Sequence, residues 1–193
     1  MQSECRRLDT EVPMDNSHND EISTPRLCLR RISRSDLDSY HEIMRKQEVC
    51  QWLAGPARKT PSETQQLIDK LANHWREKGY GVWGVFINDG GLLIGHCGLA
   101  YLQETGETEL QYAFDPEYWG YGYATESAME ALKWAFAKTG QERIIALAMP
   151  DNKRSIGVLE KLGFRPLGMK RYFGTGLLCF EIFRDSVPGA TLD

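Results

Sequence analysis

The sequence predicts a single mixed α/β domain. Its 193 residues match the usual size of one compact domain, and its 41% hydrophobic and 26% charged residues are typical of a globular protein. Segments with alternating apolar residues are interleaved with segments of helical spacing, without a linker or an internal repeat between them. We therefore expect one domain over residues 22–185, an acidic arm at residues 1–21 and a short tail at residues 186–193.

The first ordered element is expected to be a strand. Residues 1–21 show neither a two-residue nor a 3.6-residue apolar period. The run Arg26-Leu-Cys-Leu-Arg-Arg-Ile32 then alternates in the way that strands do. The alternation places its arginines on a solvated strand face, which we favour over a nucleic-acid-binding surface.

Two helices should follow this strand. The stretch Ser33-Arg-Ser-Asp36 has the form of a capping box, and the apolar residues after it fall at helical spacing. The stretch Thr60-Pro-Ser-Glu63 is a stronger helix start, because it combines a threonine cap, a proline at the first helical position and a carboxylate three residues after the cap. An apolar stripe at 67–75 continues this helix, and Gly79 ends it.

Strand patterns dominate the next part of the chain. We expect strands at 80–87, 92–102 and 108–114, joined by a hairpin turn at Asn88-Asp-Gly-Gly91 and by a turn around Gly106.

The last part of the domain alternates helices and strands. After Asp115-Pro116 a glycine-rich bend leads into a helix with an apolar inner side, which Gly140 stops. A strand at 143–149, a short helix at about 153–162 and two further strands complete the domain.

The charge balance excludes several classes of partner. The chain has 23 Lys and Arg against 27 Asp and Glu, a net charge of −4, which offers no general attraction to nucleic acid or to an anionic bilayer. No apolar run reaches the length of about 18 residues that a membrane-spanning helix needs. Because the first residues are polar and acidic, we expect no secretory signal and a cytoplasmic protein without a nucleic-acid or membrane partner.

The cysteines and histidines predict no metal site. The five cysteines are scattered without a Cys-x-x-Cys pair, and the four histidines lack metal-ligand spacing. We expect the cysteines to be reduced thiols that behave as small apolar residues.

A glycine-rich segment carries the first chemical signal. In Tyr118-Trp-Gly-Tyr-Gly-Tyr-Ala-Thr-Glu126, two glycines and a small alanine stand between a strand and a helix. The free amides at such a helix start, together with the helix dipole, form a phosphate-binding site. The segment matches neither the dinucleotide fingerprint nor a Walker loop. A purely structural bend remains the alternative.

A second signal lies in the stretch 150–164. Asn152 and Ser155 stand three residues apart at the start of the last helix. They can serve as a helix cap and a first-turn hydroxyl, or they can point an amide and a hydroxyl at one ligand. The residues alone leave both interpretations open.

Together the two segments resemble the GNAT acetyltransferase superfamily, and within it the ribosomal-protein N-terminal alanine and serine acetyltransferases. The resemblance covers about residues 22–185. Trp119-Gly-Tyr-Gly-Tyr-Ala124 stands where the family has Gln/Arg-x-x-Gly-x-Gly/Ala, and Asn152-x-x-Ser155 runs into Glu160-Lys-Leu-Gly-Phe164. The sequence departs from the family at Trp119, which replaces Gln or Arg.

The resemblance implies a mixed sheet of about seven strands, splayed at its centre, with helices on both faces. It implies acetyl-coenzyme A as co-substrate and no metal. The pantetheine arm would pair with the strand at 112–114, and the pyrophosphate would lie on the glycine-rich loop. The cofactor-binding residues implied are Tyr112, Ala113, Phe114, Gly120, Tyr121, Gly122, Tyr123, Ala124, Thr125, Asn152 and Ser155.

The resemblance also suggests the catalytic groups. Glu109 is the candidate base, at a place where several family members carry a glutamate; a solvated glutamate near Gly106, Glu126 as base, or proton loss to water are the alternatives. The usual leaving-group acid is a tyrosine, but Leu159 stands at that position. Ser155 is therefore expected to assist the thiolate, and the Ala113 amide to stabilise the oxyanion.

The acceptor is less well defined. We expect the first two helices and the last hairpin to form its pocket, with Trp52, Tyr172 and Phe173 as candidate walls. The expected activity is N-acetyl transfer to a protein N-terminal α-amine or a small-molecule amine, by a monomer or a homodimer. The alternative is a non-catalytic module that only binds acyl-coenzyme A.

Overall fold

The computed structural model describes residues 20–53 and 58–188 and confirms the mixed α/β class. The expected arm lies almost wholly outside the described residues, as do residues 54–57 and the last five residues of the expected tail.

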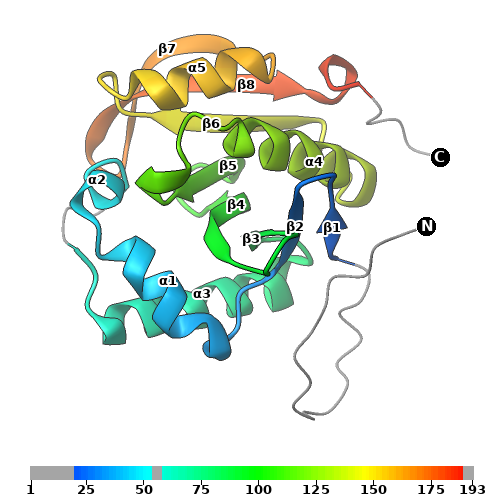
Figure 1. Ribbon diagram of the computed structural model, residues 1–193. Coiled ribbons are helices and arrows are strands. Elements are labelled where there is room, and N and C mark those ends of the chain that lie inside the picture. Colours follow the sequence, from blue (N-terminus) through cyan, green and yellow to red (C-terminus); the bar gives the residue numbers. More distant parts are fainter. Residues whose placement is uncertain (1–19, 54–57, 189–193) are drawn as a thin grey trace.

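One eight-stranded sheet, in the order β1-β2-β3-β4-β5-β6-β8-β7, forms the centre of the molecule (Figure 1). Its strands are β1 (Ile22–Ser23), β2 (Leu27–Arg31), β3 (Val82–Ile87), β4 (Leu93–Leu102), β5 (Glu107–Phe114), β6 (Arg143–Ala148), β7 (Arg165–Tyr172) and β8 (Thr175–Phe183). Neighbouring strands are antiparallel except β5 and β6, which are parallel. The two-residue β1 brings the count above the expected seven.

Helices cover both faces of this sheet, as expected (Figure 1). They are α1 (Leu37–Met44), α2 (Gln47–Cys50), α3 (Pro61–Lys78), α4 (Tyr123–Lys138) and α5 (Lys153–Lys161), with short 3-10 turns at Arg34–Asp36, Pro116–Tyr118 and Arg184–Ser186. The four-residue α2 is too short to produce a period in the sequence, so the pattern did not predict it.

The start of α3 forms as its sequence predicts. The Thr60 hydroxyl accepts a hydrogen bond from the Glu63 N–H at 3.2 Å, and the Glu63 carboxylate accepts one from the Thr60 N–H at 2.7 Å. The helix ends at Gly79, whose φ of 72° favours glycine.

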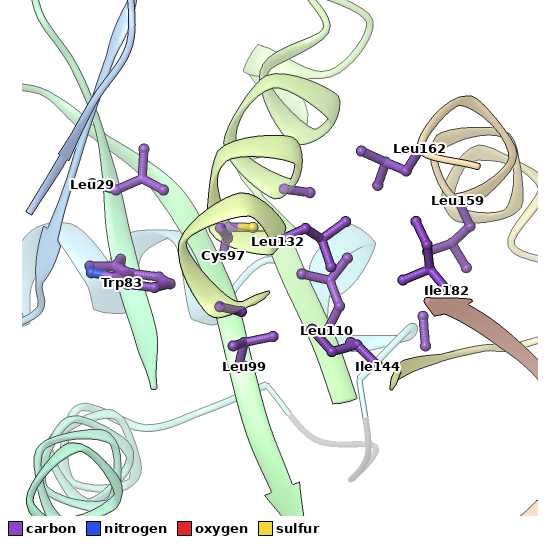
Figure 2. Close-up of a cluster of buried hydrophobic side chains, with 14 of the residues drawn as sticks. Leu29, Trp83, Cys97, Leu99, Leu110, Leu132, Ile144, Leu159, Leu162 and Ile182 are labelled. Atoms are coloured by element: carbon purple, nitrogen blue, oxygen red, sulfur yellow. The ribbon is translucent and has the colours of Figure 1, made fainter. Parts of the chain in front are cut away.

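Two apolar layers hold the helices on the sheet. Figure 2 shows the larger layer, where Leu132 of α4 and Leu159 of α5 meet Leu110 of β5 and Ile144 of β6. On the opposite face, α1 and α3 bury a second cluster against the first half of the sheet. The larger layer, which we call the α4 layer, thus joins the two halves of the sheet across the parallel pair of β5 and β6.

The parallel pair is splayed. Among the described residues, one register pair joins β5 to β6, between Glu109 and Ile145. Beyond this point the two strands diverge towards Phe114 and Ala148, so the β5 edge there has no partner in β6. This opening is where the candidate site lies.

The cysteines differ in part from the expectation. Cys50, Cys97 and Cys179 are buried free thiols, as expected. Cys28 is disulfide-bonded, so the expectation of reduced thiols is wrong for this residue. Scattered cysteine positions in a sequence do not show which thiols the fold brings together.

Burial of His96 predicts a pH-dependent stability. The ring lies between β4 and α1, its Nδ1 is 2.9 Å from the Tyr40 hydroxyl, and burial lowers its pKa to about 4 from the ordinary 6.5. The unfolded chain therefore binds a proton that the folded chain excludes. Stability present above pH 6.5 is lost as the pH falls towards 4, by up to about 3 kcal/mol.

Urea unfolding of the wild type and of His96→Gln between pH 4 and 8 measures this effect. The variant, which has no titrating ring, should lack this component of the pH dependence. Equal pH slopes for the two proteins would show that His96 does not cause it.

Candidate functional site

A cavity of about 1210 Å³ lies at the opening between β5 and β6. Its walls come from both strands, from the glycine-rich loop before α4, from α5, from the region of α2 and from the β7–β8 hairpin. Segments far apart in the sequence therefore share one space.

Most of the site residues predicted from the sequence line this cavity. They are Glu109, Tyr112, Ala113, Phe114, Gly120, Gly122, Tyr123, Ala124, Thr125, Asn152 and Ser155. The exception is Tyr121, which is 62% exposed and stacks on the Tyr123 ring at 5.9 Å between centroids. The expected acceptor walls Trp52, Tyr172 and Phe173 line the cavity as well.

The glycine-rich loop presents free backbone donors to the cavity. Gly122 is the N-cap of α4 with φ 82°, and no side chain of the described residues caps this helix. The Glu126 N–H bonds to the Gly122 carbonyl at 3.0 Å, so the amides of Tyr123, Ala124 and Thr125 precede the first intrahelical bond. Three amides without an intrahelical partner and the positive end of a 16-residue helix are chemically suited to bind an anion.

An arginine from the other end of the chain holds this loop. Arg26, at the β1–β2 turn, donates from Nη1 to the Tyr121 carbonyl at 3.0 Å and from Nε to Glu126 at 2.7 Å. The Thr24 hydroxyl donates to the same carboxylate at 2.5 Å. Glu126 is therefore engaged by the β1–β2 turn and is poorly placed to act as a base.

A second arginine, Arg154, lies beside Trp119, the loop position where the family pattern has Gln or Arg. The Trp119 ring donates from Nε1 to the Phe114 carbonyl at 2.8 Å, which fastens the loop to the end of β5. The Arg154 guanidinium of α5 lies over that ring at 4.9 Å from its centroid, and Arg154 also lines the cavity. A guanidinium thus reaches the loop from α5, although Trp119 replaces the Gln or Arg of the family pattern.

Asn152 and Ser155 meet at the start of α5. The Asn152 side-chain oxygen accepts the Ser155 N–H at 3.1 Å and so caps the helix, while both side chains line the cavity. The Ser155 hydroxyl is 2.9 Å from the Tyr112 hydroxyl, which also donates to the Ser155 carbonyl at 3.1 Å. Sequence reasoning gave Tyr112 a backbone role only, because nothing local predicts a contact across 43 residues.

Leu159 lies one turn after Ser155. Its side chain is 1% exposed within the α4 layer. A hydrocarbon side chain cannot donate a proton to a leaving group. The side chains of Ser155 and Tyr112, whose oxygens lie 2.9 Å apart, do carry hydroxyls.

Glu109 is half-buried at the narrow end of the opening. It stands opposite Ala100 of β4 and Ile145 of β6, and burial raises the pKa of its carboxyl to about 7. No hydrogen bond or ion pair joins that carboxyl to another residue of the described chain. Its neighbour Glu107 is instead paired with Arg143 and accepts a hydrogen bond from Tyr172, which lower its pKa. Glu109 is thus suited to exchange protons near neutral pH.

Within the described ranges, no group of three or more histidine, cysteine or acidic residues is arranged to hold a metal. None of the helices in that part of the chain is long and apolar enough to cross a membrane.

Comparisons with known proteins agree with this geometry. The family model described as an acetyltransferase (GNAT) domain matches residues 26–165. The uncharacterized N-acetyltransferase YoaA of Bacillus subtilis is 29% identical over 153 residues, 79% of this chain and 86% of that protein. Spermidine N(1)-acetyltransferase of Escherichia coli K12 is 27% identical over 154 residues, 77% of this chain and 78% of that protein.

A solved structure with bound CoA-disulfide shares this fold. The structure of Mycobacterium smegmatis RimJ in complex with CoA-disulfide superposes with a TM-score of 0.74 at 18% identity, covering 85% of this chain and 86% of that one. At this identity the likeness shows the fold alone.

Proposed function

The chain belongs to the GNAT acetyltransferase family, and on this premise we propose that it transfers the acetyl group of acetyl-coenzyme A to a primary amine by direct attack in a ternary complex. The acceptor in this proposal is a protein N-terminal α-amine or a small-molecule amine. One observation carries it: a single cavity joins an anion-binding helix terminus to a carboxyl with a pKa of about 7.

The chemistry of the walls fits the coenzyme. In the proposal its pyrophosphate lies on the amides from Gly120 to Thr125, with Arg154 supplying a nearby positive charge. Its pantetheine arm pairs with the β5 edge at residues 112–114, which has no partner in β6. The coenzyme supplies an activated thioester, and the protein positions and polarises it. RimJ, whose structure contains a CoA-disulfide, shares this fold.

The proposed reaction needs one base and two hydrogen-bond donors. The acceptor ammonium loses a proton to Glu109; with a pKa near 8, an α-amine needs only a modest base. The nitrogen lone pair attacks the thioester carbon, a C–N bond forms and the C–S bond breaks. Because Ala113 is paired with His96 and directs its N–H towards β4, the oxyanion donor in this proposal is a backbone N–H on the open side of β5 instead of the expected Ala113 amide. The leaving thiolate keeps the C–S electron pair, accepts a hydrogen bond from Ser155 and is finally protonated from solvent.

Replacing Ser155 by alanine should slow turnover more than it weakens coenzyme binding. The change removes one hydrogen bond to a developing charge, worth roughly 1 to 3 kcal/mol, or about ten- to a hundredfold in kcat. Steady-state kinetics with saturating acetyl-coenzyme A, beside titration calorimetry of coenzyme binding, separates the two effects. Normal turnover of Ser155→Ala would assign thiolate stabilisation to another group.

Thiol release tests the proposal against its alternative. A catalyst releases coenzyme A when acetyl-coenzyme A is mixed with primary amines, whereas a non-catalytic acyl-coenzyme A module binds tightly without turnover. Leu159, in place of an acid, is the observation that favours the module. The cytoplasmic location, the monomer or homodimer and the domain limits stay predictions.

A further inference from the structure

The charges on the cavity wall are unequal. Within residues 20–53 and 58–188, Glu109 is the one carboxylate that lines the cavity, while Lys153, Arg154 and Lys161 of α5 line it with positive charge. A ligand with several positive charges would therefore meet one carboxylate and leave its other ammonium groups without acidic partners in this wall.

The surroundings of Glu109 are apolar instead. On its face of the sheet, Leu102 belongs to an apolar cluster with Leu147 and Leu177 of β6 and β8, and all three line the cavity. Of the other nearby carboxylates, Glu107 is paired with Arg143 and bonded by Tyr172, and Glu104 lies on the exposed surface, where it accepts the N–H of Phe173 at 3.3 Å. The wall thus suits one ammonium group with an apolar neighbour.

Phe173 has a positive φ although its side chain is exposed, so burial of the ring does not explain this backbone conformation. Tyr172 pairs with Thr175, so Phe173 and Gly174 form a two-residue hairpin turn with φ values of 52° and 74°. Such turns favour Asn-Gly, and Phe173 is the one non-glycine residue of the described chain with positive φ. A strained phenylalanine that remains 47% exposed and lines a cavity points to a binding role. Figure 1 shows this hairpin on the side of the molecule where α2 lies.

We propose that the acceptor is a singly charged primary amine with an apolar or aromatic group beside the amine, which packs on Phe173 and Trp52 while the nitrogen approaches Glu109. This inference rests on the proposed acetyl transfer and narrows its acceptor. The proposed acceptor differs from a polyamine, although a spermidine N(1)-acetyltransferase is among the relatives of this chain. The same chemistry can come from a peptide whose first residue is apolar or from a small arylalkylamine.

Coenzyme A release with three acceptors tests this inference. The acceptors are the peptide amide Phe-Ala-Ala-Ala, 2-phenylethylamine and spermidine. We expect kcat/KM for the peptide or the arylalkylamine to exceed that for spermidine by about tenfold or more, the scale of one apolar group in a pocket. The better of the two apolar acceptors identifies the source. Spermidine as the best acceptor would overturn the inference but leave acetyl transfer intact. No release with these three acceptors or with the wider set of primary amines would overturn both.

Substitutions at Phe173 separate binding from folding. Phe173→Asn places a favoured residue in the turn, so we expect a higher melting temperature with an about tenfold lower kcat/KM for the apolar acceptor and an unchanged KM for acetyl-coenzyme A. Phe173→Tyr keeps the aromatic ring, so it should restore most of the acceptor kcat/KM that Phe173→Asn loses. An unchanged acceptor kcat/KM in Phe173→Asn would remove this residue from acceptor binding.

Discussion

Glu109→Gln is expected to lower kcat/KM for the amine acceptor by about a hundredfold or more, the usual contribution of a positioned base. Burial raises the pKa of this carboxyl to about 7, so in the wild type the base is lost as the pH falls below that value. The wild-type profile should therefore decline on the acidic side of pH 7. The variant should lack this limb, because its amide does not titrate.

A control on α4 distinguishes catalysis from a general charge effect. Glu130 pairs with Lys133 on that helix and does not line the cavity, so Glu130→Gln should keep the wild-type rate and profile. If Glu109→Gln keeps both the rate and the acidic limb, proton removal belongs to solvent and Glu109 is a spectator in the cavity wall.

Gly122→Val is expected to weaken acetyl-coenzyme A binding by about a hundredfold or more while the protein still folds. A β-branched residue does not tolerate the φ of 82° at this N-cap, so the loop must shift its amides away from the phosphate position. The nearest atom to an added Cβ is Nη2 of Arg26 at 3.6 Å, an ordinary contact, so no backbone collision should unfold the chain. Titration calorimetry with acetyl-coenzyme A measures the loss.

Gly140→Val is the matched control at the opposite end of α4. Gly140 has φ 69° and nothing within 4 Å of an added Cβ, so its substitution brings a similar strain away from the cavity. Both variants should lose stability by about 1 to 2 kcal/mol or more, but only the Gly122 variant should lose coenzyme affinity. Equal coenzyme affinities in the two folded variants would remove the loop amides from phosphate binding.

Local signals in the sequence predicted most of the elements. The capping box at Thr60 and the left-handed Gly79 define α3 within one residue, because both act on the backbone beside them. The sequence missed α2, where four residues show no period, and the disulfide state of Cys28. The glycine-rich loop and the Asn152–Ser155 spacing were sufficient to predict the family. A phosphate-binding loop and a helix cap are both built from residues close together in the chain, so both leave a pattern in the sequence.

The sequence by itself determined the α/β class, the family and the helix terminus that faces the cavity. Only the tertiary structure decided how the side chains of distant segments share the site. It placed Arg26 on the Tyr121 carbonyl, Arg154 on the Trp119 ring and the Tyr112 hydroxyl against Ser155. It also decided that Glu109 is desolvated rather than solvated beside Gly106, because burial depends on which strands diverge. Backbone geometry is encoded locally, whereas electrostatic environment and side-chain partners arise from packing between residues far apart in the chain.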